Sequence, residues 1–249
     1  MTTFLRPLII LTLVVVLATT AFAADCKGLP SHQQLRAALI TAVAQETSGL
    51  DFQMWATIVN RDGEVCAVAF SGNDRGDQWP GSRVISAQKA NTANAFSLDK
   101  LALSTANLYS AVQPGGSLYG LQHSNPVDTG VAYGGNSANN GQANDFMVGQ
   151  KIGGVNVFGG GLGLYNPQHK VVGGLGVSGD TSCADHMIAW RVRNLLGLDN
   201  FGTAVGGVSG DPARPDNIIY DIMGGQSAKG FGHPQCINTA DPSTLPPVH

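Results

Sequence analysis

The stretch KVVGGLGVSGDTSCADHMIAWRVRNLL, Lys170–Leu196, decides the fold because it joins a glycine-dense apolar run to a helical pattern. The apolar run indicates a strand, and the spacing of Ile188 and Val192 after it is that of a helix with one buried face. Gly179 supplies a tight turn between the two, and one of residues 180–182 caps the helix. The stretch therefore predicts a strand, a turn and a closing helix.

The same junction has a catalytic interpretation. Residues 176–179, Gly-Val-Ser-Gly, are close to the G-x-S-x-G elbow of serine hydrolases, with Ser178 as the nucleophile. Asp180 stands where that elbow has its last glycine, and the elbow belongs to a parallel sheet. The glycine clusters at 159–161 and 173–174 also lack a G-x-G-x-x-G pattern that opens a helix. We therefore interpret the junction as a structural turn, with a hydrolase as the weaker alternative.

The segments that precede the junction indicate an α+β domain. Residues 31–47 have the spacing of an amphipathic helix, and residues 51–70 form two strand patterns around Asp62-Gly63, a typical turn pair. Residues 82–97 predict a second helix whose alanine face lies close to a sheet or another helix, and whose outward side chains include Arg83 and Lys89. Two more strands, within 152–165 and 171–178, contain many glycines, which suggests close approach of another backbone or a ligand. Strands in hairpins predict an antiparallel sheet.

The N-terminal segment indicates export. An apolar run after Arg6 ends in Ala-Phe-Ala at 21–23, the pattern that a signal peptidase cleaves. We expect a signal peptide at 1–23, a domain at 24–205 with a long loop at 107–150, and a Gly/Pro-rich tail at 206–249. An uncleaved membrane anchor is the alternative. A periplasmic or secreted protein without a stable membrane span after cleavage follows from the first interpretation.

Composition limits the classes of partner. The chain has 14 Lys and Arg against 17 Asp and Glu, a net charge of −3, and no basic cluster beyond the signal segment, which excludes nucleic acid as an expected partner. Export makes the four cysteines candidates for two disulfides in one of three pairings. Because no C-x-x-C or H-E-x-x-H pattern is present, a metal site is the weaker reading.

Several segments together resemble a known family. These are TIVNRDGEVCAVAFSG, the helix segment 82–92 with its KANTA at 89–93, FGGGLGLY and GGLGVSGDTSCAD. They are similar to the GlcG/HbpS-like family, also found as the C-terminal domain of PduO-type proteins, over residues 35–196. The resemblance implies a profilin-like fold, a five-stranded antiparallel sheet flanked by helices, and assembly into homo-oligomers. It also implies a haem or corrinoid-related ligand.

The resemblance leads to a hypothesis about function: an exported haem-binding protein for capture, storage or sensing. Gly160 and Gly161 would leave room beside the sheet, and Arg83 and Lys89 would bind the haem propionates. His123, with Tyr119 as second candidate, would reach over the pocket from the long loop and bind the iron. The alternatives are a small-molecule redox or lyase enzyme that uses the same pocket, or an oligomeric assembly module without a cofactor. No catalytic residue is assigned, and whether the protein is an enzyme stays open.

Overall fold

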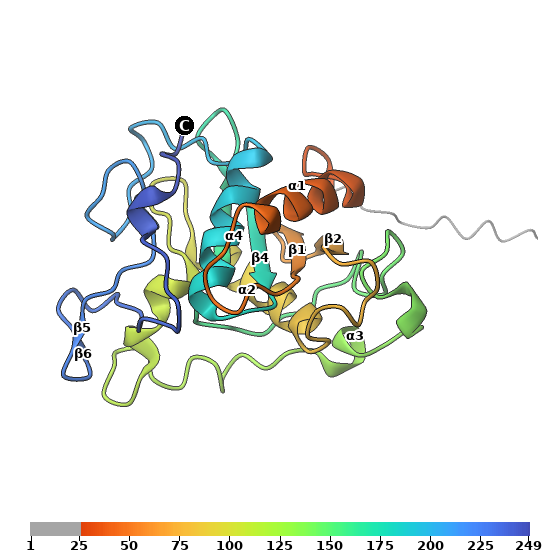
Figure 1. Ribbon diagram of the computed structural model, residues 1–249, viewed down its shortest axis with the longest axis horizontal. Coiled ribbons are helices and arrows are strands. Elements are labelled where there is room, and N and C mark those ends of the chain that lie inside the picture. The colour runs from red at the N-terminus through yellow and green to blue at the C-terminus, as the bar shows by residue number, and fades with distance from the viewer. Residues whose placement is uncertain (1–25) are drawn as a thin grey trace, which may run out of the picture.

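A computed structural model describes residues 26–249, so the expected signal peptide at 1–23 lies outside the described residues. The chain folds around a four-stranded antiparallel sheet of order β2-β1-β4-β3, with helices on both faces (Figure 1). The main elements are α1 (His32–Ala44), β1 (Trp55–Asn60), β2 (Val65–Phe70), α2 (Ser82–Phe96), β3 (Gly161–Tyr165), β4 (Val171–Ser178) and α4 (Ser182–Leu195). Within residues 26–249, no helix has the length and apolar character needed to cross a membrane.

The stretch that decides the fold forms the central strand β4 and the closing helix α4, as predicted. β4 pairs with β1 on one side and with β3 on the other. Thr181 is the N-cap of α4, and its side chain accepts a hydrogen bond from the Ala184 N–H at 3.3 Å. Such a cap satisfies one of the backbone donors that every helix start leaves unpaired. The turn residues therefore fix where the strand ends and the helix begins.

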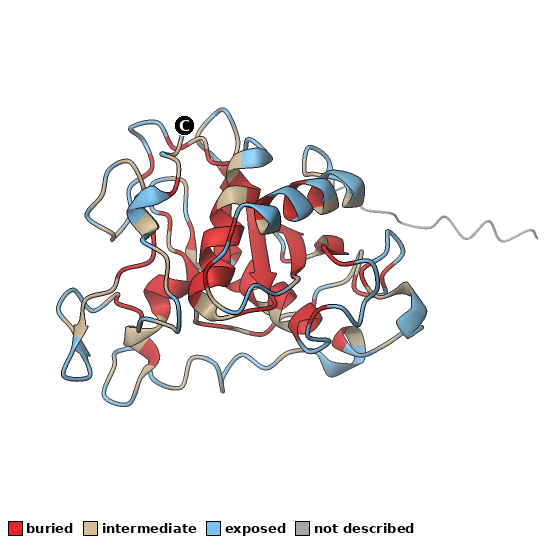
Figure 2. Ribbon diagram, viewed as in Figure 1, coloured by how far each residue is buried: buried red, intermediate tan, exposed pale blue. Residues whose placement is uncertain are grey.

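Two apolar layers hold the helices to the sheet. In β1, Ala56 and Ile58 pack with α1 and α4, whereas Trp55 and Val59 pack with α2. This alternation is what a strand buried on both faces requires, because successive side chains point to opposite sides. Figure 2 shows the result: the sheet and the inward sides of the helices are buried, while the long loops around them carry most of the exposed residues.

The glycines of β4 allow α2 to lie directly on the sheet. A Cβ added to Gly174 would stand 2.2 Å from the carbonyl oxygen of Ala90, and one added to Gly176 would stand 1.9 Å from that of Ser86. Ala87 and Ala90 of the helix face are fully buried. The expected close approach of another backbone to these glycines, and of an alanine face to the sheet, is confirmed.

The expected outward direction of Arg83 and Lys89 is wrong, because α2 is covered on both sides. Arg83 is 3% exposed and Lys89 is 0% exposed. Arg83 forms a two-point ion pair with Asp145 and donates to the Ala132 carbonyl, both in the long loop. The loop therefore closes over the helix face that the sequence pattern left open.

The expectation of five strands is also wrong, since the sheet has four. The outer edge of β3 bonds to other groups: the Tyr165 N–H donates to the Leu198 carbonyl at 2.7 Å, and the Gly161 N–H donates to Thr105 Oγ1 at 2.8 Å. Arg193 Nη1 donates to the Gly163 carbonyl at 3.2 Å. An edge whose polar groups are already bonded offers a further strand little to pair with. Residues 152–160, expected as part of a strand, are irregular.

Two disulfides fix the N-terminal segment and the tail. Cys26 bonds to Cys66 of β2, and Cys183 of α4 bonds to Cys236, so no described cysteine is free. The prediction of two disulfides is confirmed, and the structure selects one of the three pairings. The long loop contains short helical turns, including α3 (Thr129–Ala132), and the tail contains a hairpin of β5 (Ile222–Met223) and β6 (Gln226–Ser227).

Candidate functional site

A buried ion pair lies beneath the junction of β4 and α4. Lys89 Nζ donates to Asp185 Oδ2 at 2.6 Å and to the Val177 carbonyl at 3.0 Å. Asp185 Oδ1 accepts the backbone N–H groups of Gly179 and Asp180, each at 3.0 Å. One carboxylate therefore joins helix α2, the turn and the start of α4.

Burial acts against the charge on both partners of this pair. It raises the pKa of Asp185 to about 6 and lowers the pKa of Lys89. The attraction between the two groups and their hydrogen bond oppose both shifts. A buried charge stays charged only when it is paired and hydrogen-bonded, which these contacts provide.

Gly160 and Gly161 lie against this pair, and protein atoms fill the space beside them. Gly160 has φ +115°, and an added Cβ would stand 2.3 Å from the Val177 carbonyl and 3.0 Å from Lys89 Nζ. At Gly161 an added Cβ would stand 2.6 Å from the Lys89 carbonyl. The glycines thus admit helix α2 at the positions where the sequence suggested room for a ligand.

Two buried histidines flank the start of α4. His186 Nε2 accepts the Ile218 N–H at 3.1 Å, and burial lowers the pKa of His186 to about 3. His233, in the tail, contacts the Pro234 carbonyl through Nδ1 at 2.7 Å, and burial lowers its pKa to about 4. Both rings are therefore neutral at neutral pH, each engaged by backbone groups.

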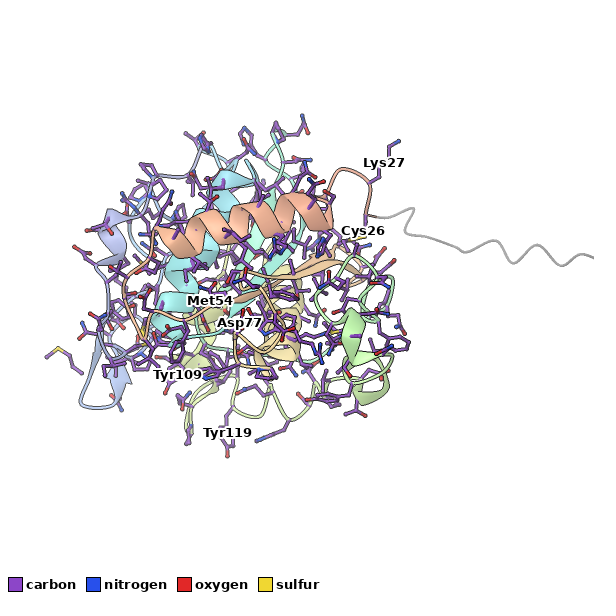
Figure 3. The ribbon with its side chains drawn as sticks, turned by 45° about the vertical axis from the view of Figure 1, so that its right-hand side comes forward. Cys26, Lys27, Met54, Asp77, Tyr109 and Tyr119 are labelled. Carbon is purple, nitrogen blue, oxygen red and sulfur yellow. A yellow bond between two sulfur atoms is a disulfide. The ribbon has the colours of Figure 1, made fainter. Side chains whose placement is uncertain are left out.

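A large hollow on the described surface lies beside tail residues that precede and follow His233 in the sequence. Its volume is about 610 Å³, and residues of 109–116, residues of 222–230 and Pro234 line it. Tyr109 is the lining side chain with an ionisable group, and its ring packs on that of His233 with centroids 5.1 Å apart and planes tilted by 54°. Figure 3 shows Tyr109 on the side of the molecule that carries the β5–β6 hairpin. The edge of the hollow at Tyr109 therefore rests on a buried ring, that of His233.

The structure brings only part of the predicted site together. Lys89, Gly160 and Gly161 are in contact, whereas no hydrogen bond or ion pair among the described residues joins Arg83, Tyr119 or His123 to them. Tyr119 is 64% exposed and His123 is exposed, and neither lines the hollow. In Figure 3, Tyr119 points away from the sheet at the edge of the molecule.

The sequence did not predict the contact between Tyr109 and the tail. The sequence signal for a cluster in the tail is the spacing of His233 and Cys236, which are three positions apart and can therefore lie side by side. Tyr109 had none, because its partner His233 is more than 120 positions away in sequence. Ser178 is 3% exposed at the end of an antiparallel strand and, among the described residues, forms no hydrogen bond with a histidine, so the turn interpretation is favoured over the hydrolase.

A comparison with known protein families shows to which family the chain belongs. A family model described as "Haem degrading protein HbpS-like" matches residues 32–193. The chain belongs to the HbpS-like family. The resemblance read from the sequence is confirmed. The HbpS-like match ends at residue 193. The tail residues that line the hollow therefore lie outside it, as do His233 and Cys236.

Solved structures are similar to about two thirds of the chain. A Klebsiella pneumoniae protein, ORFY, is 25% identical, with a TM-score of 0.45, and the match covers 66% of this chain and 86% of that one. A PduOC:heme complex is 24% identical, with a TM-score of 0.45 and coverages of 66% and 89%. A double mutant of HbpS from Streptomyces reticuli is 15% identical, with a TM-score of 0.43 and coverages of 66% and 83%. No curated protein sequence matches the chain.

Proposed function

We propose that this HbpS-like protein is an exported haem-binding protein that serves haem capture, storage or sensing. The observation that carries the proposal is the match of residues 32–193 to a family described by its action on haem. The hollow beside Tyr109 supports it, because it combines a volume of about 610 Å³ with a tyrosine, a known type of iron ligand.

The hollow fits the requirements of a haem. Its volume of about 610 Å³ lies within the range of roughly 300–1,000 Å³ that is typical of small-molecule sites. Pro114, Ile222 and Pro234 offer apolar surface for the face of the macrocycle. Tyrosine is an axial ligand of haem iron in some haem proteins, and among the lining residues Tyr109 is the one of a known ligand type.

Tyr109 and its neighbours would hold the group. The Tyr109 oxygen would bind the iron, and the Tyr109 ring packs on the buried ring of His233. Gln113 and Gln226 line the same hollow and can donate side-chain amide hydrogen bonds to the propionates, whereas the Ser110 hydroxyl already donates to the Gly232 carbonyl at 2.6 Å. Haem, when bound, supplies redox and oxygen chemistry.

The residues predicted from the sequence remain testable alternatives. His123 and Tyr119 follow the lining segment closely in sequence, and either binds iron in this hollow only if residues 117–125 turn toward it. Arg83 and Lys89 bind propionates only if haem displaces their buried carboxylate partners, Asp145 and Asp185. Such displacement leaves a buried carboxylate unpaired, which is costly. Tyr109 requires neither change.

A haemin titration with four proteins tests the proposal. Wild-type protein should give a saturable, shifted Soret band at one haem per chain, and His123→Ala and Tyr119→Phe should retain it. Tyr109→Phe, which keeps the ring but removes the oxygen, should lose the shifted band. A wild-type spectrum that stays that of free haemin would refute haem binding, and loss of the band in His123→Ala alone would move the ligand to His123. Addition of ascorbate in air separates storage from degradation, because only degradation bleaches the band.

Export and assembly complete the proposal. Two disulfides support a periplasmic or secreted location, since disulfides persist in oxidising compartments. N-terminal sequencing of exported protein should begin near Ala24. Light scattering after gel filtration should give a mass that is a multiple of the chain mass if the protein forms the proposed homo-oligomer.

A further inference from the structure

A second cluster of ligand-type side chains lies at the start of α4. The Sγ atoms of Cys183 and Cys236 and a ring nitrogen of His233 all lie within 4.8 Å of one another. Within residues 26–249 this is the one group of three His, Cys, Asp or Glu residues so arranged. The two cysteines form a disulfide in this structure, so their sulfurs are not available to a metal ion in this state.

A backbone carbonyl orients the ring of His233, as is common for histidines that bind metals. Its Nδ1 lies 2.7 Å from the Pro234 carbonyl, so Nδ1 carries the proton that it donates to that oxygen. Nε2 therefore keeps its lone pair, and it lies 3.4 Å from the Gly159 N–H and 3.3 Å from Ser182 Oγ. A backbone carbonyl that fixes the tautomer and ring orientation is the usual support of a histidine ligand.

The Cys236 sulfur lies where a thiolate is stabilised, whereas Cys183 Sγ lies 3.6 Å from the Pro234 carbonyl. Cys236 Sγ accepts the backbone N–H of Cys183 at 3.2 Å, in the first turn of the 14-residue helix α4. Ser182 Oγ stands 3.6 Å from the same sulfur. The N-terminus of a helix favours a negative charge on sulfur, and the thiolate is the form that binds metals. The cluster therefore combines two potential thiolates with an oriented imidazole.

We propose that reduction of the Cys183–Cys236 disulfide creates a site in which Cys183, Cys236 and His233 bind one Zn²⁺ ion. Two cysteines and one histidine match the donor preference of Zn²⁺, with a fourth position left for Ser182 or water. Tetrahedral zinc has Zn–S bonds of about 2.3 Å and Zn–N bonds of about 2.0–2.1 Å, which places two sulfur ligands about 3.8 Å apart. The two sulfurs, 2.02 Å apart in the disulfide, must therefore separate on reduction, whereas the His233 nitrogen already lies within 4.8 Å of both.

The chemistry requires a dithiol as reductant. The dithiol gives two electrons and two protons to the disulfide and itself becomes a disulfide, which leaves two thiols at Cys183 and Cys236. Each thiol then releases its proton when its sulfur binds Zn²⁺, whose oxidation state does not change. The oxidised protein thus excludes the ion, and the reduced protein keeps the tail tied to α4 through the ion in place of the disulfide.

Cobalt(II) is the probe that tests this site. The protein is reduced with dithiothreitol without air, freed of reductant and titrated with Co²⁺. We expect thiolate-to-cobalt charge-transfer bands and the visible bands of tetrahedral Co²⁺, saturating at one ion per chain and displaced by Zn²⁺. Oxidised protein should show none of them. The double variant Cys26→Ser, Cys66→Ser is the matched control: it lacks the other disulfide and should keep the bands.

The ligand set is tested in two independent ways. Cys183→Ser with Cys236→Ser should abolish the bands, and His233→Gln should shift them and weaken binding. Zinc-edge X-ray absorption on the reduced wild type should count two sulfur ligands and at least one nitrogen, which does not depend on how the variants fold. Reduced wild type without tetrahedral bands, bands that vanish in the Cys26/Cys66 variant, or a zinc ion with four sulfur ligands would each overturn the proposal.

Discussion

Gly176→Ala is the substitution that tests the packing of α2 most severely. The added methyl carbon would stand 1.9 Å from the Ser86 carbonyl oxygen and 2.5 Å from the Ala90 nitrogen, where ordinary contacts begin at 3.4 Å. Both are backbone atoms, so no rotamer change relieves the overlap and the helix itself must move by about 1.5 Å. Overpacking that side chains can absorb costs about 1–3 kcal/mol. We therefore expect a loss of about 3 kcal/mol or more of unfolding free energy.

Urea unfolding followed by tryptophan fluorescence measures this loss, because Trp55 and Trp190 are buried in the two apolar layers. Gly81→Ala is the matched control: Gly81 precedes α2 with φ −63°, and an added Cβ meets nothing within 4 Å. Its unfolding free energy should change by less than about 1 kcal/mol. Equal effects of the two substitutions would refute the close contact between α2 and β4.

Two further predictions concern the buried polar groups. Lys89→Met leaves the Asp185 carboxylate buried without its cation and should lower the unfolding free energy by about 3–5 kcal/mol. The double variant Lys89→Met, Asp185→Asn should recover part of this loss in the same urea assay. A larger loss in the double variant than in Lys89→Met would contradict the ion pair. Burial lowers the pKa of His186 to about 3 in the folded protein, whereas the pKa in the unfolded chain is about 6.5. The neutral ring therefore contributes its full stabilisation above pH 6.5, and this contribution is lost as the pH falls from about 6.5 toward 3. The stability of wild type should therefore fall more steeply than that of His186→Asn, by about 1.4 kcal/mol per pH unit, and parallel curves between pH 6 and 4 would contradict the burial of a neutral ring.

The local elements could be predicted because their determinants are close in sequence. The turn at Gly179 and the cap at Thr181 define the β4–α4 junction, and the alanine spacing of residues 82–97 indicates the face that lies on the sheet. The glycines of β4 predicted a close neighbour, although not which one. In each case the residues that carry the signal lie within a few positions of the element that they predict.

The remainder depends on contacts between distant segments. The helix pattern places Arg83 on an outward face, but the long loop covers that face and pairs Arg83 with Asp145, which is 62 positions away in sequence. The missing fifth strand depends on Thr105 and Leu198, which bond to the edge of β3 from other parts of the chain. The hollow beside Tyr109 needs the tail for its second wall. Periodicity and motif spacing do not record such pairings.

If Tyr109 binds the haem iron, haemin should dissociate more readily from Tyr109→Phe than from Tyr119→Phe, and the ratio of the two dissociation constants measures this difference. Both substitutions remove a single oxygen, one from a ring that lines the hollow and one from an exposed ring ten positions later in the chain. Absorbance titrations should show weakened binding and an altered Soret band for Tyr109→Phe, and wild-type behaviour for Tyr119→Phe. Wild-type binding by Tyr109→Phe would contradict the account.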